Sequence, residues 1–376
     1  MRVAQVVPRG EQPWSGILTV IVSLAAALAR RGHDVEVWQL HAWDPDTYVE
    51  QRRGLDAAGV AQVPLLAPRG LGRAAAALAD ERDVDIVHLH GAFNRSNTTV
   101  SSALRRPYVF SPHSGYDPVS LRRSRVRKLV YRLLFERRML RRAALLVALT
   151  DSELEQLRDV GAGRHVAVIP NGVEPAPDDI DRGVFRAETG VQADTPLAVF
   201  VGRLDVHRKG LDVLVRGVAE APAWHLGLVG PSFRDVEGLE AMIVDLGVGD
   251  RVHLVGERHG RALLECLGAA DVFTLLSRWE GLPMALLEAL SVGTPAVVSP
   301  AVGRLVDVEA AGAGWVAPEG GLGLILRRLQ EEGSPERERR RLAALELSKR
   351  YDWNAVAQQY EVALEGLIGS GRAMKW

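Results

Sequence analysis

Two glutamates, Glu280 and Glu288, carry the most specific chemistry that this sequence offers. They lie in the run RWEGLPMALLEAL at residues 278–290. Pro283 suits the first position of a helix, so we expect Glu280 in the loop before that helix and Glu288 about a turn and a half inside it. An ionised carboxylate among apolar residues is costly unless groups donate hydrogen bonds to it. The pair therefore suits a polyol, with a sugar at one end and a ribose at the other. The alternative is that Glu280 is an acid favoured by the helix dipole and that Glu288 forms a salt bridge with a neighbour.

A loop rich in glycine and cations follows the strand expected at 197–201. It has the sequence GRLDVHRKG, with Arg203 and Lys209 between glycines, and it opens a helix. Arg can fork onto two phosphate oxygens, Lys adds a point charge, and a helix N-terminus adds N–H groups. The loop therefore suits a diphosphate; the alternative is a solvated basic loop.

The loop PWSGI at 13–17 offers a second helix N-terminus, where Gly16 permits close approach of a ligand to the backbone. This loop lacks the three-glycine dinucleotide fingerprint, which argues against a nicotinamide or flavin cofactor.

Histidines and acids elsewhere give weaker indications. His113 follows the strand expected at 108–113 and can contact a sugar or phosphate, or act in proton transfer; the alternative is a residue that caps its own loop. His88 and His90 alternate along a strand, but no third ligand with zinc spacing is visible, so we interpret them as packing and rim residues. Two D-x-D patterns, at 44–46 and 83–85, are interpreted as incidental. We expect no metal site.

The composition limits the class of protein. With 376 residues the chain is long enough for two domains, since single cores stop growing near about 250 residues. A net charge of −1 gives no reason to expect a nucleic acid as partner. With Cys266 as the single cysteine, an internal disulfide is excluded and a reducing, cytoplasmic location is expected. The apolar run at 17–29 imitates a secretory signal, but it lies between two expected strands and is too short to span a bilayer.

Strand and helix patterns alternate along the chain, which indicates an α/β protein with parallel sheets covered on both faces. We expect a domain at 1–173, a linker at 174–196, a second domain at 197–351 and a terminal helical segment at 352–376 that packs back on the first domain. The expected strands are 3–7, 34–40, 59–65, 85–90, 108–113, 144–150, 166–170, 197–201, 225–229, 251–255, 271–276, 295–299 and 314–317. Ligands of such sheets bind at the carboxyl ends of the strands.

Together these motifs resemble those of family 4 retaining glycosyltransferases (GT4). The resemblance rests on the Arg203 and Lys209 loop, the Glu280–x7–Glu288 pair, the Asn171–Gly172 turn and Ser111–Pro112–His113, and it covers essentially the whole chain. It implies the GT-B fold, with two Rossmann-like, doubly wound domains facing across a cleft.

The resemblance also implies roles for individual residues. Arg203 and Lys209 would bind the diphosphate of a UDP- or GDP-sugar, Glu288 the ribose, and Glu280 the transferred sugar. His113 would lie near the reacting carbon. Further donor contacts would come from Gly16, from Arg258 near the base, and from the backbone around Gly281, Leu282 and Met284.

Two features depart from the family pattern. The first loop has less glycine than usual, and His113 is followed by Ser114 where a glycine commonly comes.

The acceptor side is indicated by two segments. Residues 121–142 carry ten Arg and Lys and a single acid, Glu136, beside an apolar stripe of Val126, Leu129, Val130, Leu133 and Leu140. A basic amphipathic helix suggests peripheral contact with anionic lipid at the inner face of a membrane; the alternative is an ordinary helix with a solvated basic face. Asn94 and Arg95, after the fourth expected strand, are candidates for acceptor contact.

The sequence thus predicts a metal-independent, cofactor-free transferase that moves a hexose-type sugar to a lipid-linked glycan or a natural product, with retention of configuration. The alternatives are a nucleotide-sugar 2-epimerase of the same fold and a catalytically silent sugar-nucleotide binding protein.

Overall fold

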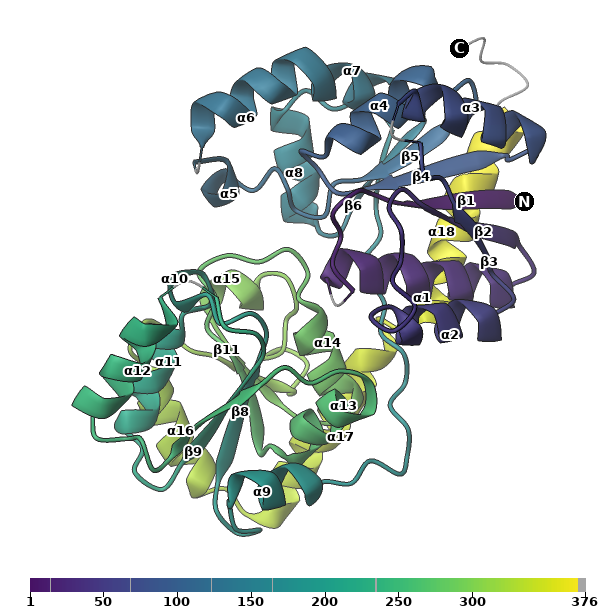
Figure 1. Cartoon of the computed structure of the whole chain (residues 1–376). Coiled ribbons are helices and arrows are strands. Elements are labelled where there is room, and N and C mark those ends of the chain that lie inside the picture. The colour runs from purple at the N-terminus through teal and green to yellow at the C-terminus, as the bar shows by residue number, and fades with distance from the viewer. Residues whose placement is uncertain (14, 68, 123, 164, 234, 371–376) are drawn as a thin grey trace. The chain divides into compact units, whose positions relative to one another are not determined.

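The computed structural model describes residues 1–13, 15–67, 69–122, 124–163, 165–233 and 235–370. The chain forms two compact units (Figure 1). The first comprises Met1–Gly172 together with the C-terminal segment from Trp353, and the second comprises Val173–Asp352. Within the described ranges, no helix is long and apolar enough to cross a bilayer.

The first unit is built on a seven-stranded parallel sheet with the order β3-β2-β1-β4-β5-β6-β7. Its central strands are mostly apolar, as expected for strands covered on both faces, but β1 and β4 also carry the buried polar residues Gln5, His88 and His90. The strands are β1 (Arg2–Val7), β2 (Asp34–Gln39), β3 (Ala61–Pro64), β4 (Ile86–His90), β5 (Tyr108–Ser111), β6 (Leu145–Ala148) and β7 (Val166–Val168). The helices are α1 (Gly16–Arg30), α2 (Val49–Ala57), α3 (Leu71–Glu81), α4 (Arg95–Ala103), α5 (Pro118–Arg122), α6 (Arg125–Tyr131), the π-helical η1 (Arg132–Glu136), α7 (Arg137–Arg142), α8 (Asp151–Asp159) and α18 (Trp353–Ser370).

The second unit is built on a six-stranded parallel sheet with the order β10-β9-β8-β11-β12-β13. Its strands are β8 (Leu197–Val201), β9 (His225–Val229), β10 (Val252–Gly256), β11 (Val272–Leu275), β12 (Ala296–Val298) and β13 (Gly314–Val316). Its helices are α9 (Val184–Thr189), α10 (Val206–Lys209), α11 (Leu211–Ala219), α12 (Val236–Asp245), α13 (Gly260–Ala269), α14 (Met284–Ser291), α15 (Pro300–Gly303), α16 (Leu322–Gln330) and α17 (Ser334–Lys349). Every strand expected from the sequence is present, with ends that differ by at most about two residues, as is usual at element boundaries.

The last helix, α18, belongs to the first unit although it follows the second in sequence. It lies against α1 (Figure 1), and its Glu361 forms an ion pair with Arg31 and lies 3.1 Å from Nε2 of His33. Trp353 and Tyr360, which open and centre this helix, are both almost fully buried. The apolar face of α18 therefore completes the core of the first unit.

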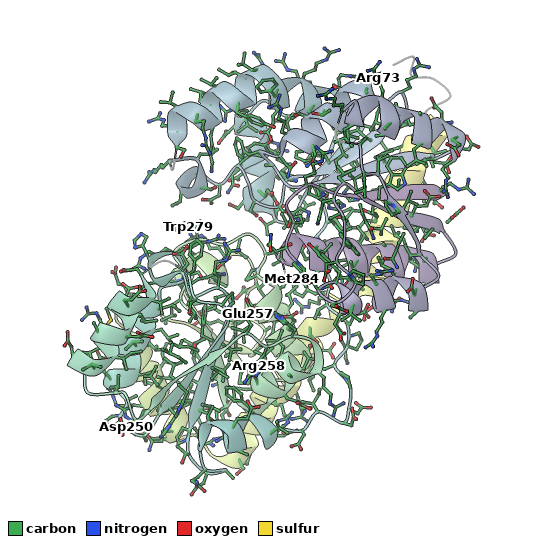
Figure 2. The ribbon with its side chains drawn as sticks, in the orientation of Figure 1. Arg73, Asp250, Glu257, Arg258, Trp279 and Met284 are labelled. Atoms are coloured by element: carbon green, nitrogen blue, oxygen red, sulfur yellow. The ribbon has the colours of Figure 1, made fainter. Side chains whose placement is uncertain are left out.

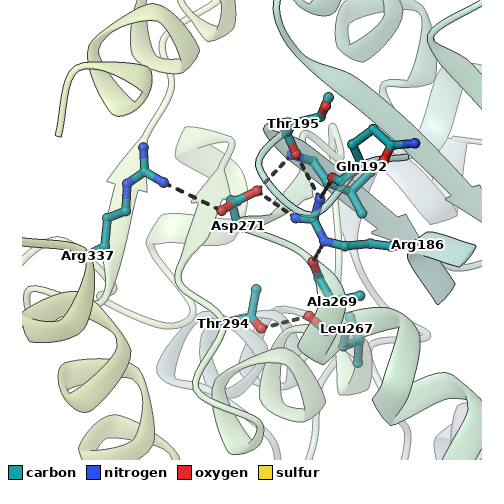
Figure 3. Close-up of polar contacts among 9 residues, drawn as sticks. Arg186, Gln192, Thr195, Leu267, Ala269, Asp271, Thr294 and Arg337 are labelled. Atoms are coloured by element: carbon teal, nitrogen blue, oxygen red, sulfur yellow. Dashed lines mark hydrogen bonds and ion pairs between the residues drawn. The ribbon is translucent and has the colours of Figure 1, made fainter. Parts of the chain in front are cut away.

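The segment 174–196, which the sequence predicts as a linker, is part of the second unit in the structure. Arg186 of α9 ties it to the amino end of the sheet (Figure 3). The guanidinium donates to the carbonyl oxygens of Gln192 and Thr195, each at 2.8 Å, and pairs with Asp271 at 2.9 Å. Asp271 also accepts from the backbone N–H of Leu197 at 2.8 Å. A partly buried arginine with these partners anchors the segment to the sheet, which proline and acid content alone does not indicate.

Both sheets reverse their strand order once, between β1 and β4 in the first unit and between β8 and β11 in the second. Parallel strands place their carboxyl ends at one edge, and ligands of such sheets bind at the point of reversal. Lys209, at the end of the short α10, follows β8, and Glu280 lies in the loop after β11. Gly16, at the start of α1, follows β1, and Asn94 lies in the loop after β4.

Candidate functional site

The loop after β8 is held by a close approach of two glycines. A Cβ at Gly230 would lie 2.0 Å from the carbonyl oxygen of Gly202, and both glycines have φ near +145°. Only residues without a side chain fit this approach. Beyond it, Asp205 caps α10 by accepting from the N–H of Arg208 at 3.1 Å. The short helix therefore starts at a fixed place and directs Lys209 back toward Gly202.

Lys209 and Glu280 form the central ion pair of the second unit. Their Nζ and Oε1 atoms are 2.6 Å apart, and the side chain of Glu280 is only 6% exposed. Arg208 approaches the other carboxylate oxygen at 3.4 Å, and Ser277 donates to Oε1 at 2.7 Å. Burial alone would raise the pKa of Glu280, but Lys209 and Arg208, with the Ser277 hydrogen bond, outweigh it and lower the pKa. Glu280 is therefore ionised at neutral pH.

The loop that carries Glu280 is clamped to the loop after β8 at a second point. Arg278 makes two hydrogen bonds to Asp212 of α11, at 2.8 and 2.9 Å, and its N–H donates to the carbonyl of Arg208 at 2.9 Å. The guanidinium of Arg208 lies 5.7 Å from the ring of Trp279. These contacts fix the distance between the cationic loop and the acidic loop before any ligand arrives.

Helix α14 begins one residue later than the sequence predicts. Pro283 has extended backbone angles, φ −74° and ψ 117°, and stands at the N-cap, so Met284 is the first helical residue. Proline suits this place as well as the first turn, because neither requires its missing N–H. The carbonyl of Pro283 accepts from Leu286 and Leu287. Among the described residues, the N–H groups of Met284 and Ala285 have no acceptor, so they are available to an anion.

Glu280 lies in the loop as expected, three residues before the N-cap, followed by half-buried Gly281 and buried Leu282. Figure 2 shows Trp279 and Met284, which flank this loop, on the same side of the second unit.

Glu288 lies just over one turn inside α14 and is partly buried. No described residue donates a hydrogen bond or forms an ion pair with its carboxylate, and burial raises its pKa to about 7. The salt-bridged glutamate considered as an alternative is therefore not what the structure shows. An unpartnered, half-buried carboxyl group is a ready acceptor for hydroxyl groups of a ligand.

Arg203 and Arg258, both predicted donor contacts, have different surroundings. Arg203 is exposed, and its guanidinium lies 4.9 Å from the ring of Phe233, which restricts its motion without neutralising its charge. Arg258 donates to the carbonyl of Glu257 at 2.9 Å and pairs with Glu188 of α9 at 3.2 Å. Arg258 lines an open depression with Thr189 and His253. Figure 2 shows Arg258 beside Glu257. The guanidinium of Arg258 thus already has protein partners. A nucleotide base bound in this depression would contact the loop backbone as much as this side chain.

In the first unit, His113 follows β5 in a left-handed turn. His113 and Ser114 have φ of +51° and +60°, a region that glycine enters more easily. Glu153 holds the turn by accepting from the N–H of Ser114 and, at 2.8 Å, from that of Leu149. The departure from the family pattern at Ser114 therefore keeps the conformation that a glycine would take.

The other loops of the first unit that the sequence predicts as ligand contacts are held by helix caps. Ser15 caps α1 by accepting from Leu18 at 3.1 Å, which places Gly16 at the first position of the helix; Trp14 of this loop lies outside the described residues. Asn94 caps α4 by accepting from the N–H of Ser96 at 2.9 Å, whereas Arg95 is exposed. Asn94 thus has a structural task that is sufficient to explain it, and Arg95 is the freer of the two acceptor candidates.

The expected apolar stripe of 121–142 does not form one buried face. Val126, Leu129, Val130 and Leu133 are exposed, and Leu140 is buried in the core. The helix is interrupted by η1, where Glu136 turns inward and accepts from Phe93 N–H and, at 3.0 Å, from the hydroxyl of Tyr116.

Sequence reasoning missed Arg208 and Ser277, which share Glu280 with Lys209. Arg208 stands next to Lys209 in the same cationic loop, and that adjacency was the available indication. In the described part of the chain, no group of three or more His, Cys, Asp or Glu side chains is placed to hold a metal ion. Asp44 caps a turn at Thr47, and Asp85 accepts from the N–H of Arg2 at 2.7 Å.

Comparisons with known proteins agree with this arrangement. The family model described as "Glycosyltransferase Family 4" matches residues 14–176, and the model described as "Glycosyl transferases group 1" matches residues 181–342. A D-inositol 3-phosphate glycosyltransferase of Kineococcus radiotolerans is 32% identical over 337 residues, covering 80% of this chain and 76% of the relative. A GDP-mannose:cellobiosyl-diphosphopolyprenol alpha-mannosyltransferase of Xanthomonas campestris is 25% identical over 398 aligned positions, covering 100% of this chain and 99% of the relative.

Among solved structures, Anabaena HepE in complex with UDP and glucose has a TM-score of 0.77 at 21% identity, covering 97% of this chain and 100% of that one. This similarity and the two parallel sheets confirm the predicted fold class. The chain is a glycosyltransferase with the GT-B fold and belongs to glycosyltransferase family 4.

Proposed function

We propose that this glycosyltransferase binds a nucleotide-diphosphate sugar, UDP- or GDP-linked, at the carboxyl edge of the second sheet. The observation that carries the proposal is Glu288, a partly buried carboxyl group without a partner among the described residues. Glu288 lies in the same loop and helix as Glu280, the partner of Lys209. Ribose hydroxyls would donate to Glu288, and the diphosphate would meet Lys209, Arg203 and the free N–H groups of Met284 and Ala285. A sugar next to the diphosphate would then reach Glu280.

The reaction follows from this charge arrangement. As the bond from the sugar to the diphosphate breaks, negative charge grows on the leaving oxygen, and fixed cations and N–H groups stabilise it most when they are placed in advance. Lys209 and Arg208 are held in place by Glu280, so their reorganisation during the reaction is small. We propose that the acceptor attacks the face from which the diphosphate departs, which retains the configuration, and that these cations supply the stabilisation that a metal ion gives other transferases.

The acceptor is proposed to be lipid-linked. Between residues 121 and 142, the exposed apolar side chains include Val126 at 75% and Leu134 at 67% exposure, next to the exposed Arg122, Arg125 and Arg127. Arg123, which the sequence groups with these cations, lies outside the described residues. Solvation of a basic face explains the arginines but not the exposed apolar groups, whereas an anionic membrane surface suits both. The relative in Xanthomonas campestris is named for a diphosphopolyprenol acceptor, which agrees with this proposal.

A transfer assay tests the donor and the stereochemistry. The protein is incubated with UDP- and GDP-sugars, with a polyprenyl-diphosphate-linked glycan or inositol phosphate as acceptor, with and without EDTA, and the anomeric configuration of the product is read by NMR. We expect transfer with retention that EDTA leaves intact. Turnover of the donor without any acceptor would instead support the epimerase, and binding without turnover a silent binding protein.

Sedimentation with vesicles tests the lipid surface. We expect binding to anionic vesicles at low salt and none to neutral ones, because each cation near such a surface contributes about 1 kcal/mol. The double substitution Arg125→Glu/Arg127→Glu should abolish this binding, while Arg52→Glu/Arg53→Glu, two exposed arginines of α2 with the same change in charge, should preserve it. Equal sedimentation of the two variants would contradict the proposed surface and favour a soluble acceptor.

A further inference from the structure

A chain of buried polar side chains leads from the centre of the first sheet to His113. Gln5 on β1 places its Oε1 atom 2.8 Å from Nε2 of His90 on β4. Nδ1 of His90 is in turn 3.0 Å from Nε2 of His113. The rings of His90 and His113 are stacked, with centroids 5.3 Å apart and planes inclined by 21°. Gln5 and His90 are fully buried, and both links are direct contacts between side chains.

Both histidines of this chain are neutral at physiological pH. Burial lowers the pKa of His113 to about 4, and burial together with the neighbouring His88 and His113 lowers the pKa of His90 well below its ordinary value. A neutral imidazole has one N–H and one lone pair. The two contacts are therefore coupled: if His90 donates through Nε2 to Gln5, its Nδ1 must accept, and His113 must donate through its own Nε2.

The backbone around the chain is also fixed. Asn97 donates to the carbonyl oxygens of His90 and Gly91, at 2.6 and 2.8 Å, and Glu153 holds the turn at Ser114. Among the described residues, Nδ1 of His113 has no hydrogen-bond partner, and His113 is only partly buried. This nitrogen is the outward end of the chain of side chains that begins at Gln5.

We propose that Gln5, acting through His90, is a positioning residue that keeps the proton of His113 on Nε2 and so presents the Nδ1 lone pair to the substrate. This proposal rests on the proposed function and on the family resemblance, which implies that His113 lies near the reacting carbon. His113 then accepts a hydrogen bond from a sugar hydroxyl. Had the amide of Gln5 the opposite orientation, every proton in the chain would shift and His113 would be a donor at the same place. One buried glutamine thus decides which kind of group the site accepts.

The tautomer of His113 can be measured directly. In protein with ¹⁵N- and ¹³C-labelled histidine, ring NMR shifts distinguish a proton on Nε2 from one on Nδ1, and the His113→Asn variant assigns the signal. We expect a single neutral Nε2–H form between pH 6 and 8. In Gln5→Met, which keeps the size of the side chain but removes the amide, we expect both forms.

A matched control is Gln39→Met, which removes a buried glutamine from β2 of the same sheet without touching His90. This variant should keep the wild-type tautomer. In the transfer assay, kcat/KM for the donor should fall between about two- and ten-fold in Gln5→Met, the equivalent of one net hydrogen bond, and should be unchanged in Gln39→Met.

A proton on Nδ1 in the wild type, or an unchanged tautomer in Gln5→Met, would overturn the proposal. Should Gln5→Met fail to fold, the wild-type spectrum and His90→Phe, which removes the acceptor of His113 but keeps a ring, still decide it. Because the spectrum needs no substrate, an inactive protein would contradict the proposed function and leave this measurement decisive.

Discussion

Binding of a nucleotide sugar should release a proton through Glu288. Burial holds its pKa at about 7 in the free protein. Hydroxyl donors favour the ionised form, so in the complex the pKa should return toward the ordinary value of about 4.3. At pH 6 this corresponds to release of about 0.9 proton per site, and to an affinity at pH 5.5 about 30-fold, or about 2 kcal/mol, weaker than at pH 8.

Isothermal titration calorimetry measures this release. A non-hydrolysed nucleotide sugar is suitable because its diphosphate carries no group that titrates between pH 5.5 and 8. Titration at pH 6 in buffers of different ionisation enthalpy gives the number of protons released. The control is Glu288→Gln, which keeps the shape but does not titrate. Since Glu136 and Glu153, whose pKa values burial also raises to about 7, remain in both proteins, the difference isolates Glu288.

We expect about 0.9 proton from the wild type and close to none from Glu288→Gln. Equal proton release by the two proteins, or an affinity that does not change with pH, would refute the assignment of Glu288 to ligand hydroxyls.

The remaining predictions concern stability and metal dependence. Without ligand, the raised pKa of Glu288 adds stability below about pH 4.5, and this stability is lost as the pH rises through 7. Over this range the free energy of unfolding in urea should fall by about 3 kcal/mol more in the wild type than in Glu288→Gln. The same pH dependence in both proteins would contradict this prediction. Ser114→Gly should raise the free energy of unfolding by up to about 1 kcal/mol, because glycine relieves the strain of the left-handed backbone, and Ser114→Val should lower it; the reverse order would show that the turn is unstrained. Gly230→Ala should lower stability by at least about 1 kcal/mol, because its Cβ meets a carbonyl at 2.0 Å; a neutral substitution would disprove the close approach. Arg203→Ala should weaken nucleotide binding by roughly 2 kcal/mol in calorimetry, and unchanged affinity would remove Arg203 from the site. Chelation with EDTA should leave the rate of transfer intact, and a large loss would point to a metal.

The fold could be predicted from the sequence because its pattern is local. Many strands of the two sheets are short, largely apolar runs followed by a helix, and parallel pairing leaves few other arrangements. The acidic and basic loops are predictable because Lys209 and Glu280 each follow a buried strand. The topology brings those two strands together. Some details differ from the prediction. The start of α14 moved by one position, since proline is compatible with both places. The segment 174–196 is part of the second unit, and the stripe of 121–142 is interrupted by η1.

Long-range pairing could not be predicted. The contacts of Gln5 with His90, and of His90 with His113, join β1, β4 and the turn after β5, which are separated in the sequence. The sequence predicts His88 and His90 as packing and rim residues, but both are fully buried, and only the geometry shows that His90 connects two other side chains. The sharing of Glu280 by Arg208 and Ser277 was likewise invisible, because it depends on how two loops are clamped by Arg278 and Asp212.

The measurement that tests the central claim most directly is the affinity for UDP and GDP of the wild type and of Lys209 variants. Removing Lys209 alone would strand the buried Glu280, so Lys209→Ala is combined with Glu280→Gln to keep the fold; Lys349→Ala, an exposed lysine of α17, is the matched control. If Lys209 holds the diphosphate, the double variant should bind the preferred nucleotide about 2–5 kcal/mol more weakly than the wild type, with an unchanged melting temperature, and Lys349→Ala should bind normally. Equal affinity in all three proteins would contradict a nucleotide-diphosphate site at the Lys209–Glu280 pair.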